Sequence, residues 1–153
     1  MAIIAHLDNE LTTASAASEQ AHASATHSEN IADNKYDTLA VEAAYLAHGQ
    51  SVRIAQLQQS IATYRLLMQT QKPDTESIQI GHTVTIVDTN QRSNTLFIGP
   101  SAGGISIVID GMAMMTVTAL TPMGKALIGK VVDEEISIVV GGNQQHFVIT
   151  DIK

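Results

Sequence analysis

The sequence predicts an α+β protein in two parts: an N-terminal antiparallel helical hairpin that forms a coiled coil, then a small antiparallel-sheet domain with one short helix. Before Pro73 the chain has no proline and one glycine, Gly49, and is rich in Ala, Gln, Ser and Leu, which favours helix. After Lys72 come all three prolines and the remaining glycines, between runs of Ile, Val and Thr that are typical of strands. We therefore expect the hairpin over residues 1–71, a linker over 72–77 and the sheet domain over 78–153.

The first predicted helix carries a stripe of apolar and small residues that recur in alternating steps of three and four. This spacing is typical of a coiled-coil seam, and small residues in its later part allow close helix approach. The stripe consists of Ile4, Leu7, Leu11, Ala14, Ser18, Ala21, Ala25 and Ser28.

The second predicted helix carries a similar stripe, with two successive steps of four around Gly49 and Gln50. Two such stripes fold most simply into an antiparallel hairpin with its tip within residues 27–38, and each arm reaches about 45 to 50 Å. The competing arrangement is one continuous helix that dimerises. The second stripe consists of Leu39, Ala43, Leu46, Gln50, Ile54, Leu57, Ile61, Tyr64 and Met68.

The C-terminal part reads as short strands near residues 83–87, 95–98, 105–109, 114–118, 136–140 and 146–152. A short helix interrupts them. Thr121 is a good N-cap, Pro122 suits the first helical position, and Gly129 can end the helix in a left-handed conformation.

Composition also excludes several classes of function. The absence of cysteine rules out disulfides, thiolate catalysis and Cys-type zinc sites. A net charge of -7 has the wrong sign for neutralising nucleic-acid phosphates, so we expect no direct sequence-specific DNA binding. No apolar run approaches the length of a membrane span, and no signal peptide is indicated. We expect a cytoplasmic protein with no membrane partner.

The run Thr121-Pro-Met-Gly-Lys-Ala-Leu-Ile-Gly-Lys130, followed by Val131-Val-Asp-Glu-Glu135, resembles the C-terminal signature of the Gre family of bacterial transcription elongation factors. That signature has Ser-Pro, a small and a basic residue, Ala-Leu, a hydrophobic residue, Gly-Lys and an acidic turn. The resemblance implies an FKBP-like C-terminal domain that docks on bacterial RNA polymerase. It implies docking roles for Pro122, Met123, Lys125 and Lys130. The neighbouring apolar residues fill the core or face that partner; they are Met112, Met114, Met115, Leu120 and Met123.

The predicted hairpin tip carries a partial second resemblance. Gre factors have an acidic tip of the pattern Asp-x-Ser-Glu-Asn, then a spacer and Tyr, and the sequence Ser28-Glu-Asn30 with Tyr36 is similar. The family's first acid falls at Thr26. A shifted alignment, with Ala32-Asp33-Asn34 on Ser-Glu-Asn, leaves that acid at Asn30 instead. Neither alignment supplies both carboxylates.

In this family the tip enters the secondary channel of RNA polymerase, and its carboxylates help hold Mg²⁺ in the polymerase's own active site. The resemblance therefore implies that the protein is not itself an enzyme, that it binds no cofactor tightly, that it has no metal of its own, and that it shares Mg²⁺ with the polymerase. Glu29 and Asp33 are the candidate catalytic carboxylates. The candidate supporting residues of the tip are Ser28, Asn30, Asn34, Tyr36 and Asp37.

We interpret the chain as a polymerase-binding elongation factor that acts as a monomer and modulates elongation or stimulates transcript cleavage. Two alternatives stay open at this point. The first is a Gre-like regulator or competitor that does not stimulate cleavage, because the tip departs from the acid pair. The second is a structural or adaptor protein built on a coiled coil.

Overall fold

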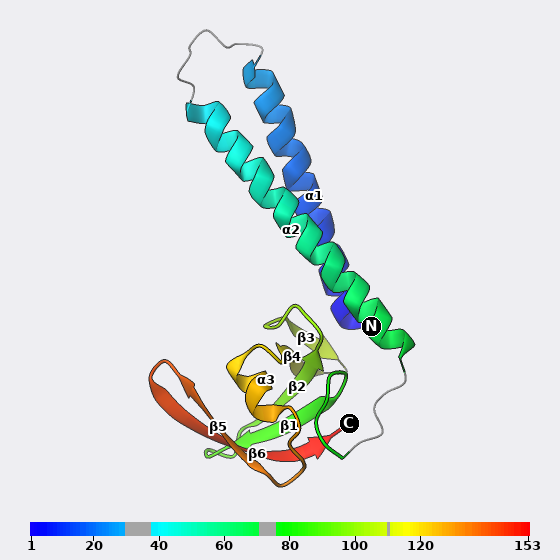
Figure 1. Cartoon of the computed structure of the whole chain (residues 1–153), viewed down its shortest axis with the longest axis vertical. Coiled ribbons are helices and arrows are strands. Elements are labelled where there is room, and N and C mark those ends of the chain that lie inside the picture. Colours follow the sequence, from blue (N-terminus) through cyan, green and yellow to red (C-terminus); the bar gives the residue numbers. More distant parts are fainter. Residues whose placement is uncertain (30–37, 71–75, 110) are drawn as a thin grey trace. The chain divides into compact units, whose positions relative to one another are not determined.

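The computed structural model describes residues 1–29, 38–70, 76–109 and 111–153 (Figure 1). The chain forms two compact units, one made mainly of Ile3–Ala62 and the other mainly of Thr63–Lys153. The unit boundary falls inside the second helix. The predicted linker over residues 72–77 lies mostly outside the described residues, and the predicted domain boundaries stay predictions.

The N-terminal unit is a pair of long helices, α1 (Ala2–Glu29) and α2 (Thr38–Gln69), which lie side by side and run in opposite directions (Figure 1). An ion pair joins them, because Arg53 Nη2 of α2 lies 2.6 Å from Glu10 Oε2 of α1. His6, one turn earlier on α1, also contacts Glu10, with its Nε2 3.5 Å from Glu10 Oε1. The predicted helix pair is confirmed.

The seam between the helices is buried at Leu7, Leu57 and Ile61, as the stripes predicted. At the start of α1 the fully buried residue is Ile3, whereas Ile4, the predicted seam position, is half-buried. Burial of a Leu or Ile side chain contributes about 1.5 to 3 kcal/mol, so these few residues hold the pair together.

Two predicted positions in the second stripe are wrong. Leu46 is 64% exposed and Met68 is 59% exposed, whereas Ala47 is half-buried. From Ala47 the half-buried and buried positions continue through residues 50, 54, 57, 61 and 64, in strict alternation of three and four. The predicted irregularity at Gly49 is therefore absent: the pattern favoured the larger Leu46, while helix geometry turns its small neighbour inward.

The C-terminal unit contains a six-stranded sheet with the order β3-β4-β2-β1-β6-β5. Its strands are β1 (Thr83–Asp88), β2 (Ser93–Gly99), β3 (Ser106–Ile109), β4 (Met112–Thr118), β5 (Glu135–Val140) and β6 (Asn143–Ile152). The predicted strands all form. The sheet is mixed rather than purely antiparallel, because β2 and β4 pair in parallel from Thr95↔Met114 to Gly99↔Thr118. The hairpin partner β3 reverses the chain between them, so β4 returns in the direction of β2.

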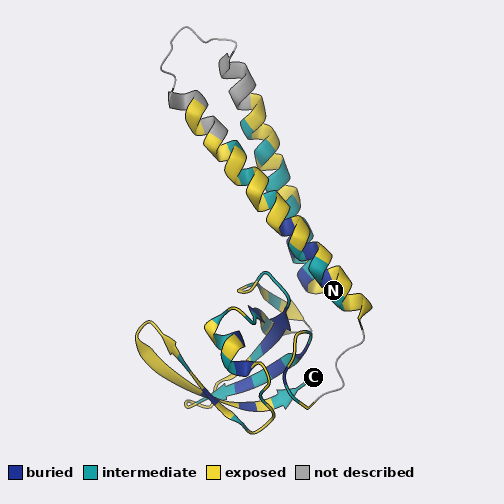
Figure 2. Ribbon diagram, in the orientation of Figure 1, coloured by how far each residue is buried: buried dark blue, intermediate teal, exposed yellow. Residues whose placement is uncertain are grey.

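One face of the sheet is covered by the short helix α3 (Pro122–Leu127), which contacts β4 and β5. Residues alternate along the strands, so Val84 and Ile86 of β1 and Phe147 and Ile149 of β6 are buried, in one core with Leu127 of α3. Figure 2 shows the buried segments of the sheet in dark blue. The core of this domain comprises Ile78, Val84, Ile86, Leu96, Ile98, Val117, Leu127, Ile136, Phe147 and Ile149.

The second compact unit also contains the last turns of α2. Tyr64 is fully buried, its hydroxyl donates to the carbonyl of Ser101 at 2.9 Å, and its ring stacks on Phe97 with centroids 6.3 Å apart. Gly99 leaves room for the phenol, since a Cβ there would lie 2.3 Å from the Tyr64 hydroxyl oxygen. Burial raises the pKa of Tyr64 to about 12.

Candidate functional site

The candidate site begins where Thr121 caps α3. Thr121 has extended backbone angles of φ -75° and ψ 153°, and its side-chain oxygen accepts a hydrogen bond from the Gly124 N–H at 3.1 Å. The same hydroxyl donates to the carbonyl of Thr118 at 2.8 Å. Pro122 follows as the first helical residue, where its missing N–H costs nothing. The predicted helix start is confirmed.

Gly124 brings α3 into close contact with the end of β4. A Cβ at this position would lie 1.9 Å from the carbonyl oxygen of Thr118, so no larger residue fits without movement of the backbone. Position 124 of this chain therefore requires a residue without a side chain. The hydroxyl bond of Thr121 to Thr118 and the absence of a side chain at Gly124 together fix the direction of the helix.

The helix ends at Leu127 with Ile128 as its C-cap, and Gly129 follows in the left-handed conformation that the sequence predicted. The N–H of Ile128 donates to the carbonyl of Gly124 at 3.0 Å, and Gly129 has a left-handed φ of 81°. The end is also tied to the segment before β1: Gly129 donates to the carbonyl of Ile78 at 2.9 Å, and Ile78 donates to the carbonyl of Lys130 at 2.8 Å. The signature is thereby built into the core of the domain.

Glu134 organises the turn after α3. Its Oε1 accepts from Lys130 Nζ at 2.7 Å, and its Oε2 accepts from the N–H of Val131 at 2.8 Å. The hydrogen bond from Lys130, followed by that from Val131, holds the pKa of the Glu134 carboxyl below its ordinary value. Lys130, a predicted docking residue, is thus paired with Glu134. The sequence predicted no role for Glu134, although the acidic turn of the signature was the signal that could have indicated one.

The other predicted docking residues lie on and beside α3. Pro122 and Lys125 are exposed, whereas Met123 is half-buried and packs against the core. Within the described part of the chain, no acidic side chain pairs with Lys125. The structure thus brings Pro122, Met123 and Lys125 onto one short helix, with Lys130 just beyond its end, and their role in docking stays a prediction.

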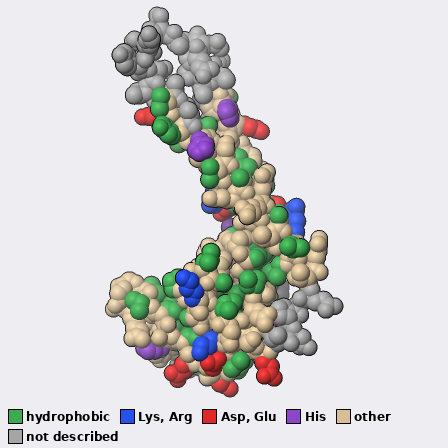
Figure 3. Space-filling model, viewed as in Figure 1, with side chains coloured by type: hydrophobic (Ala, Val, Ile, Leu, Met, Phe, Trp, Pro, Cys, Tyr) green, Lys and Arg blue, Asp and Glu red, His purple; other side chains and the backbone are tan. Residues whose placement is uncertain are grey.

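Apolar side chains surround this helix. Leu120 is 84% exposed immediately before α3, and Ile128, Val131 and Val132 are exposed after it. The space-filling view shows hydrophobic side chains gathered on this face of the sheet domain, with basic side chains among them (Figure 3). We call the surface of Leu120, Pro122, Lys125 and Ile128 the α3 surface. An exposed apolar patch with a cation is typical of a surface that binds a protein.

The methionines in and near α3 differ in how far they are exposed. Met112 is 65% exposed and Met115 is 40% exposed, whereas Met114 and Met123 are half-buried. Met114 and Met123 therefore help to fill the domain, whereas Met112 and Met115 lie on its surface, and a contact of these two with a partner stays a prediction.

The predicted tip falls largely outside the described residues. Ser28 and Glu29 are the last residues of α1, but their side chains are not among those described, and Asn30, Asp33, Asn34, Tyr36 and Asp37 lie in the undescribed segment. Their roles stay predictions. Among the side chains that the structure describes, no group of three or more His, Asp or Glu is placed to hold a metal ion.

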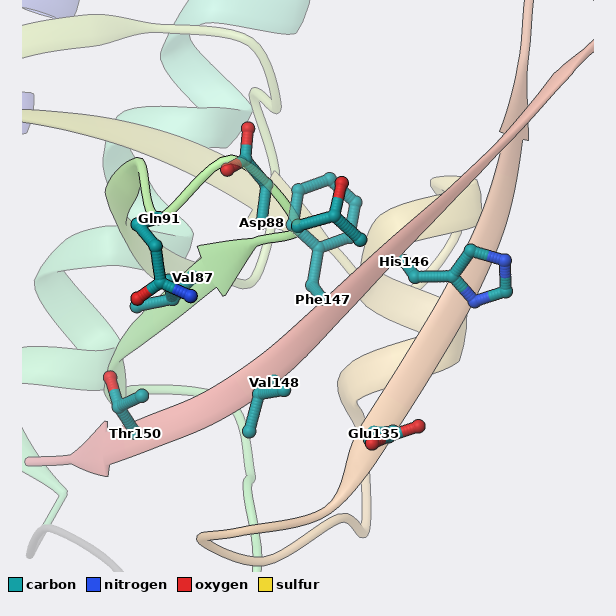
Figure 4. A pocket seen from close by; sticks show the side chains of 9 residues that line it. Val87, Asp88, Gln91, Glu135, His146, Phe147, Val148 and Thr150 are labelled. Carbon is teal, nitrogen blue, oxygen red and sulfur yellow. The ribbon is translucent and has the colours of Figure 1, made fainter.

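An open depression of about 540 Å³ lies near the β1–β2 turn (Figure 4). Val148 and Thr150 line it from the face of β6 opposite the buried Ile149. Its acidic residue Asp88 is engaged in the turn, since Oδ1 accepts from the N–H groups of Asn90 at 2.8 Å and Arg92 at 2.9 Å. Most of its lining residues are polar, but Asp88, Glu135 and His146 do not point toward one another (Figure 4), and we assign the depression no chemistry.

The described chain is therefore an antiparallel helix pair followed by a six-stranded mixed sheet with one capped helix. None of the described helices is both long and apolar enough to cross a membrane.

This chain is structurally similar over nearly all its length to solved transcription factors. A structure of the transcription factor Gfh1 has a TM-score of 0.42, with 18% identity, and the match covers 97% of this chain and 92% of that one. The GreA factor homolog 1 protein of Thermus thermophilus has a TM-score of 0.40, with 17% identity and coverage of 98% and 94%.

The prokaryotic transcription elongation factor GreA/GreB from Nitrosomonas europaea has a TM-score of 0.37, with 20% identity over 60% of this chain and 76% of that one. No family model and no curated protein sequence matches the chain.

Proposed function

We propose that this protein is a Gre-like transcription factor that binds bacterial RNA polymerase through the α3 surface. The observation that carries the proposal is the signature over residues 121–130, in which Thr121, Gly124 and Gly129 each have a distinct structural task. These tasks position Lys125 and the apolar residues around it outward on a rigid, well-tied helix. A basic and apolar surface of this kind suits a protein partner more than a small molecule.

The helix pair gives the protein the reach that such a factor needs. The 28 residues of α1 span about 42 Å and the 32 residues of α2 about 48 Å. Glu29 is the last residue of α1 and therefore lies at the far end of this arm. In our proposal the arm enters the secondary channel, and the protein serves as a cofactor of the polymerase active site rather than as an enzyme.

The chemistry at the end of the arm rests on carboxylates. Mg²⁺ prefers oxygen ligands and retains several waters, so one or two added carboxylates suffice beside a metal that another protein already holds. Glu29 and Asp33 are the residues we propose for this task, and no Mg²⁺ site of the chain's own is needed.

A second candidate function is a polymerase regulator that does not stimulate cleavage. The sequence observation that favours it is the missing first acid, at Thr26 in one alignment and at Asn30 in the other. Such a factor would occupy the channel without completing the carboxylate pair.

Transcript cleavage in backtracked elongation complexes separates the two candidates. The wild-type protein should accelerate cleavage at saturating Mg²⁺, and Glu29→Ala or Asp33→Ala should reduce the rate at least about tenfold because each removes a carboxylate oxygen near the metal. Polymerase binding should be unchanged in these variants. Glu19→Ala, an exposed acid earlier on α1, is the matched control and should cleave as the wild type does.

The outcomes are distinct. If the wild type binds polymerase but never accelerates cleavage, the non-cleaving function takes first place, and Thr26→Asp should then confer cleavage. Equal cleavage by the wild type and the double alanine variant would remove both carboxylates from the mechanism. A protein that neither binds nor accelerates cleavage would leave the coiled-coil adaptor function.

A further inference from the structure

The helix α2 has an exposed apolar face that α1 does not cover. Val41 is 55% exposed, Tyr45 75%, Val52 43% and Leu66 62%. These residues belong to a regular stripe that runs from position 41 to position 66 in strict alternation of four and three, with no charged residue at any of its positions. This is the spacing of a coiled-coil seam.

The stripe lies on the side of α2 opposite the seam with α1. The inner seam passes through Ile54, Leu57 and Ile61, and each outer position lies two residues from an inner one, which is about 200° around the helix. Over the part of α2 whose side chains are described, the turns that face away from α1 are exposed (Figure 2). A helix that is apolar on both sides is normally covered on both sides.

The first helix differs from α2 in this respect. Among the described residues of α1, no large apolar side chain is exposed, and its outer positions are mostly Ala, Thr, Asn and Gln. The exposed apolar residues of the arm are therefore concentrated on α2. If the helices of this chain were simply poorly amphipathic, α1 would also expose large apolar residues, and its described part does not.

The order of residues along the stripe fits a second copy of α2 that runs in the opposite direction. With the two-fold axis midway between Val52 and Ala55, Val52 of each copy meets Ala55 of the other. The same axis places Tyr45 opposite Ala62. Large residues thus meet small ones, which is the arrangement that fills a helix interface without overlap.

The outer layers of this register are also matched. Val41 meets Leu66, and the polar layer pairs His48 with Gln59, so that neither polar side chain faces an apolar one. A parallel register would instead set Tyr45 against Tyr45 and Ala55 against Ala55, with one layer overfilled and another empty.

Charge agrees with the antiparallel register. Glu42 and Arg65 flank the two ends of the stripe, and an antiparallel copy brings the Glu42 end of one α2 to the Arg65 end of the other. No like charges meet across the uncharged stripe itself. A net charge of -7 on the chain would otherwise disfavour self-association.

We propose that α2 pairs with α2 of a second copy of this chain, antiparallel and in this register, to form a four-helix arrangement of the two arms. The interface extends from Val41 to Leu66, about 37 Å along the helix. The proposal replaces the monomer expected from the sequence. None of the signature residues lies in the interface, so sedimentation tests the dimer without polymerase, but the dimer must dissociate before the arm of one copy can enter the secondary channel.

Sedimentation velocity of the full chain over a wide concentration range tests the proposal. The wild type should shift from monomer to dimer, and Val52→Glu should weaken the association at least about tenfold, because a carboxylate would be buried against Ala55. Leu46→Glu is the matched control: Leu46 lies on the same helix, is 64% exposed and falls outside the stripe, so dimerisation should persist. A wild type that stays monomeric at every concentration overturns the proposal.

Cross-linking tests the direction of the pair, since the chain has no native cysteine. A mixture of Val41→Cys and Leu66→Cys proteins should form a disulfide-linked dimer of the two variants under mild oxidation. Each variant alone should not, because the two copies of its thiol would lie about 37 Å apart, far beyond disulfide range. Efficient disulfide formation by either variant alone would overturn the antiparallel register.

Discussion

Glu134 fastens the turn after α3 because its two carboxylate oxygens accept from different donors, the Lys130 ammonium and the Val131 N–H. The pKa of Glu134 is lowered in the folded state by these bonds. The stabilisation is therefore fully present above the ordinary glutamate pKa of about 4.3 and is lost as the pH falls through the lower folded value.

We predict that Glu134→Gln lowers the melting temperature at neutral pH and that the difference from the wild type closes in acid. Below the folded pKa the wild-type carboxyl is protonated and resembles the amide in charge. Thermal melts at a series of pH values between neutrality and about 3 measure this. A difference that is constant over the whole series would mean that ionisation of Glu134 does not contribute.

Two helical glycines, Gly124 in α3 and Gly49 in α2, differ in the space around them, so substituting each by alanine gives a matched pair of variants. An alanine in place of glycine within a helix normally gains about 0.5 to 1 kcal/mol. In α3 this gain is opposed by the contact at Gly124, where a Cβ would lie 1.9 Å from the Thr118 carbonyl oxygen. In α2 nothing lies within 4 Å of a Cβ at Gly49.

We predict that Gly124→Ala destabilises the sheet domain by about 2 kcal/mol, since the overlap exceeds the helix-propensity gain. Gly49→Ala should instead stabilise the helix pair by about 0.5 to 1 kcal/mol. Denaturant titrations monitored separately on the helix pair and the sheet domain measure both changes. A stabilising Gly124→Ala would show that α3 can move away from β4 at little cost.

An element could be predicted from sequence where residues close by in the chain determine it. The start and end of α3 were predictable because Thr121, Pro122 and Gly129 act on their own turns of the chain. The choice of Ala47 over Leu46 for the seam was not, because it depends on the position of a second helix rather than on side-chain size.

The sequence also did not predict that β2 and β4 pair in parallel. Strand patterns report which face is buried but not which strands are neighbours, and only the position of β3 at the sheet edge makes the pairing parallel. Of the candidate site, the residues of α3 were predictable from the signature. The task of Glu134 was not, because it depends on a turn that brings its carboxylate back to Lys130 and Val131.

At the scale of the molecule, the two ends of the chain are assigned different tasks. The sheet domain holds the α3 surface, which we propose for docking, and the helix pair carries Glu29 at the end of α1. The acidic balance of the chain, with a net charge of -7, agrees with a protein partner rather than broad contact with nucleic acid. Binding to polymerase is the claim on which the proposed function depends.

Equilibrium binding of the purified chain to bacterial core RNA polymerase is the most direct test of this claim. We predict a Kd of about 1 µM or tighter for the wild type and a loss of affinity of at least about tenfold for Lys125→Glu. Lys153→Glu makes the same charge change at the 75% exposed C-terminal residue and should bind as the wild type does. No detectable binding by the wild type, or equal losses of affinity in the two variants, would contradict docking of polymerase on the α3 surface.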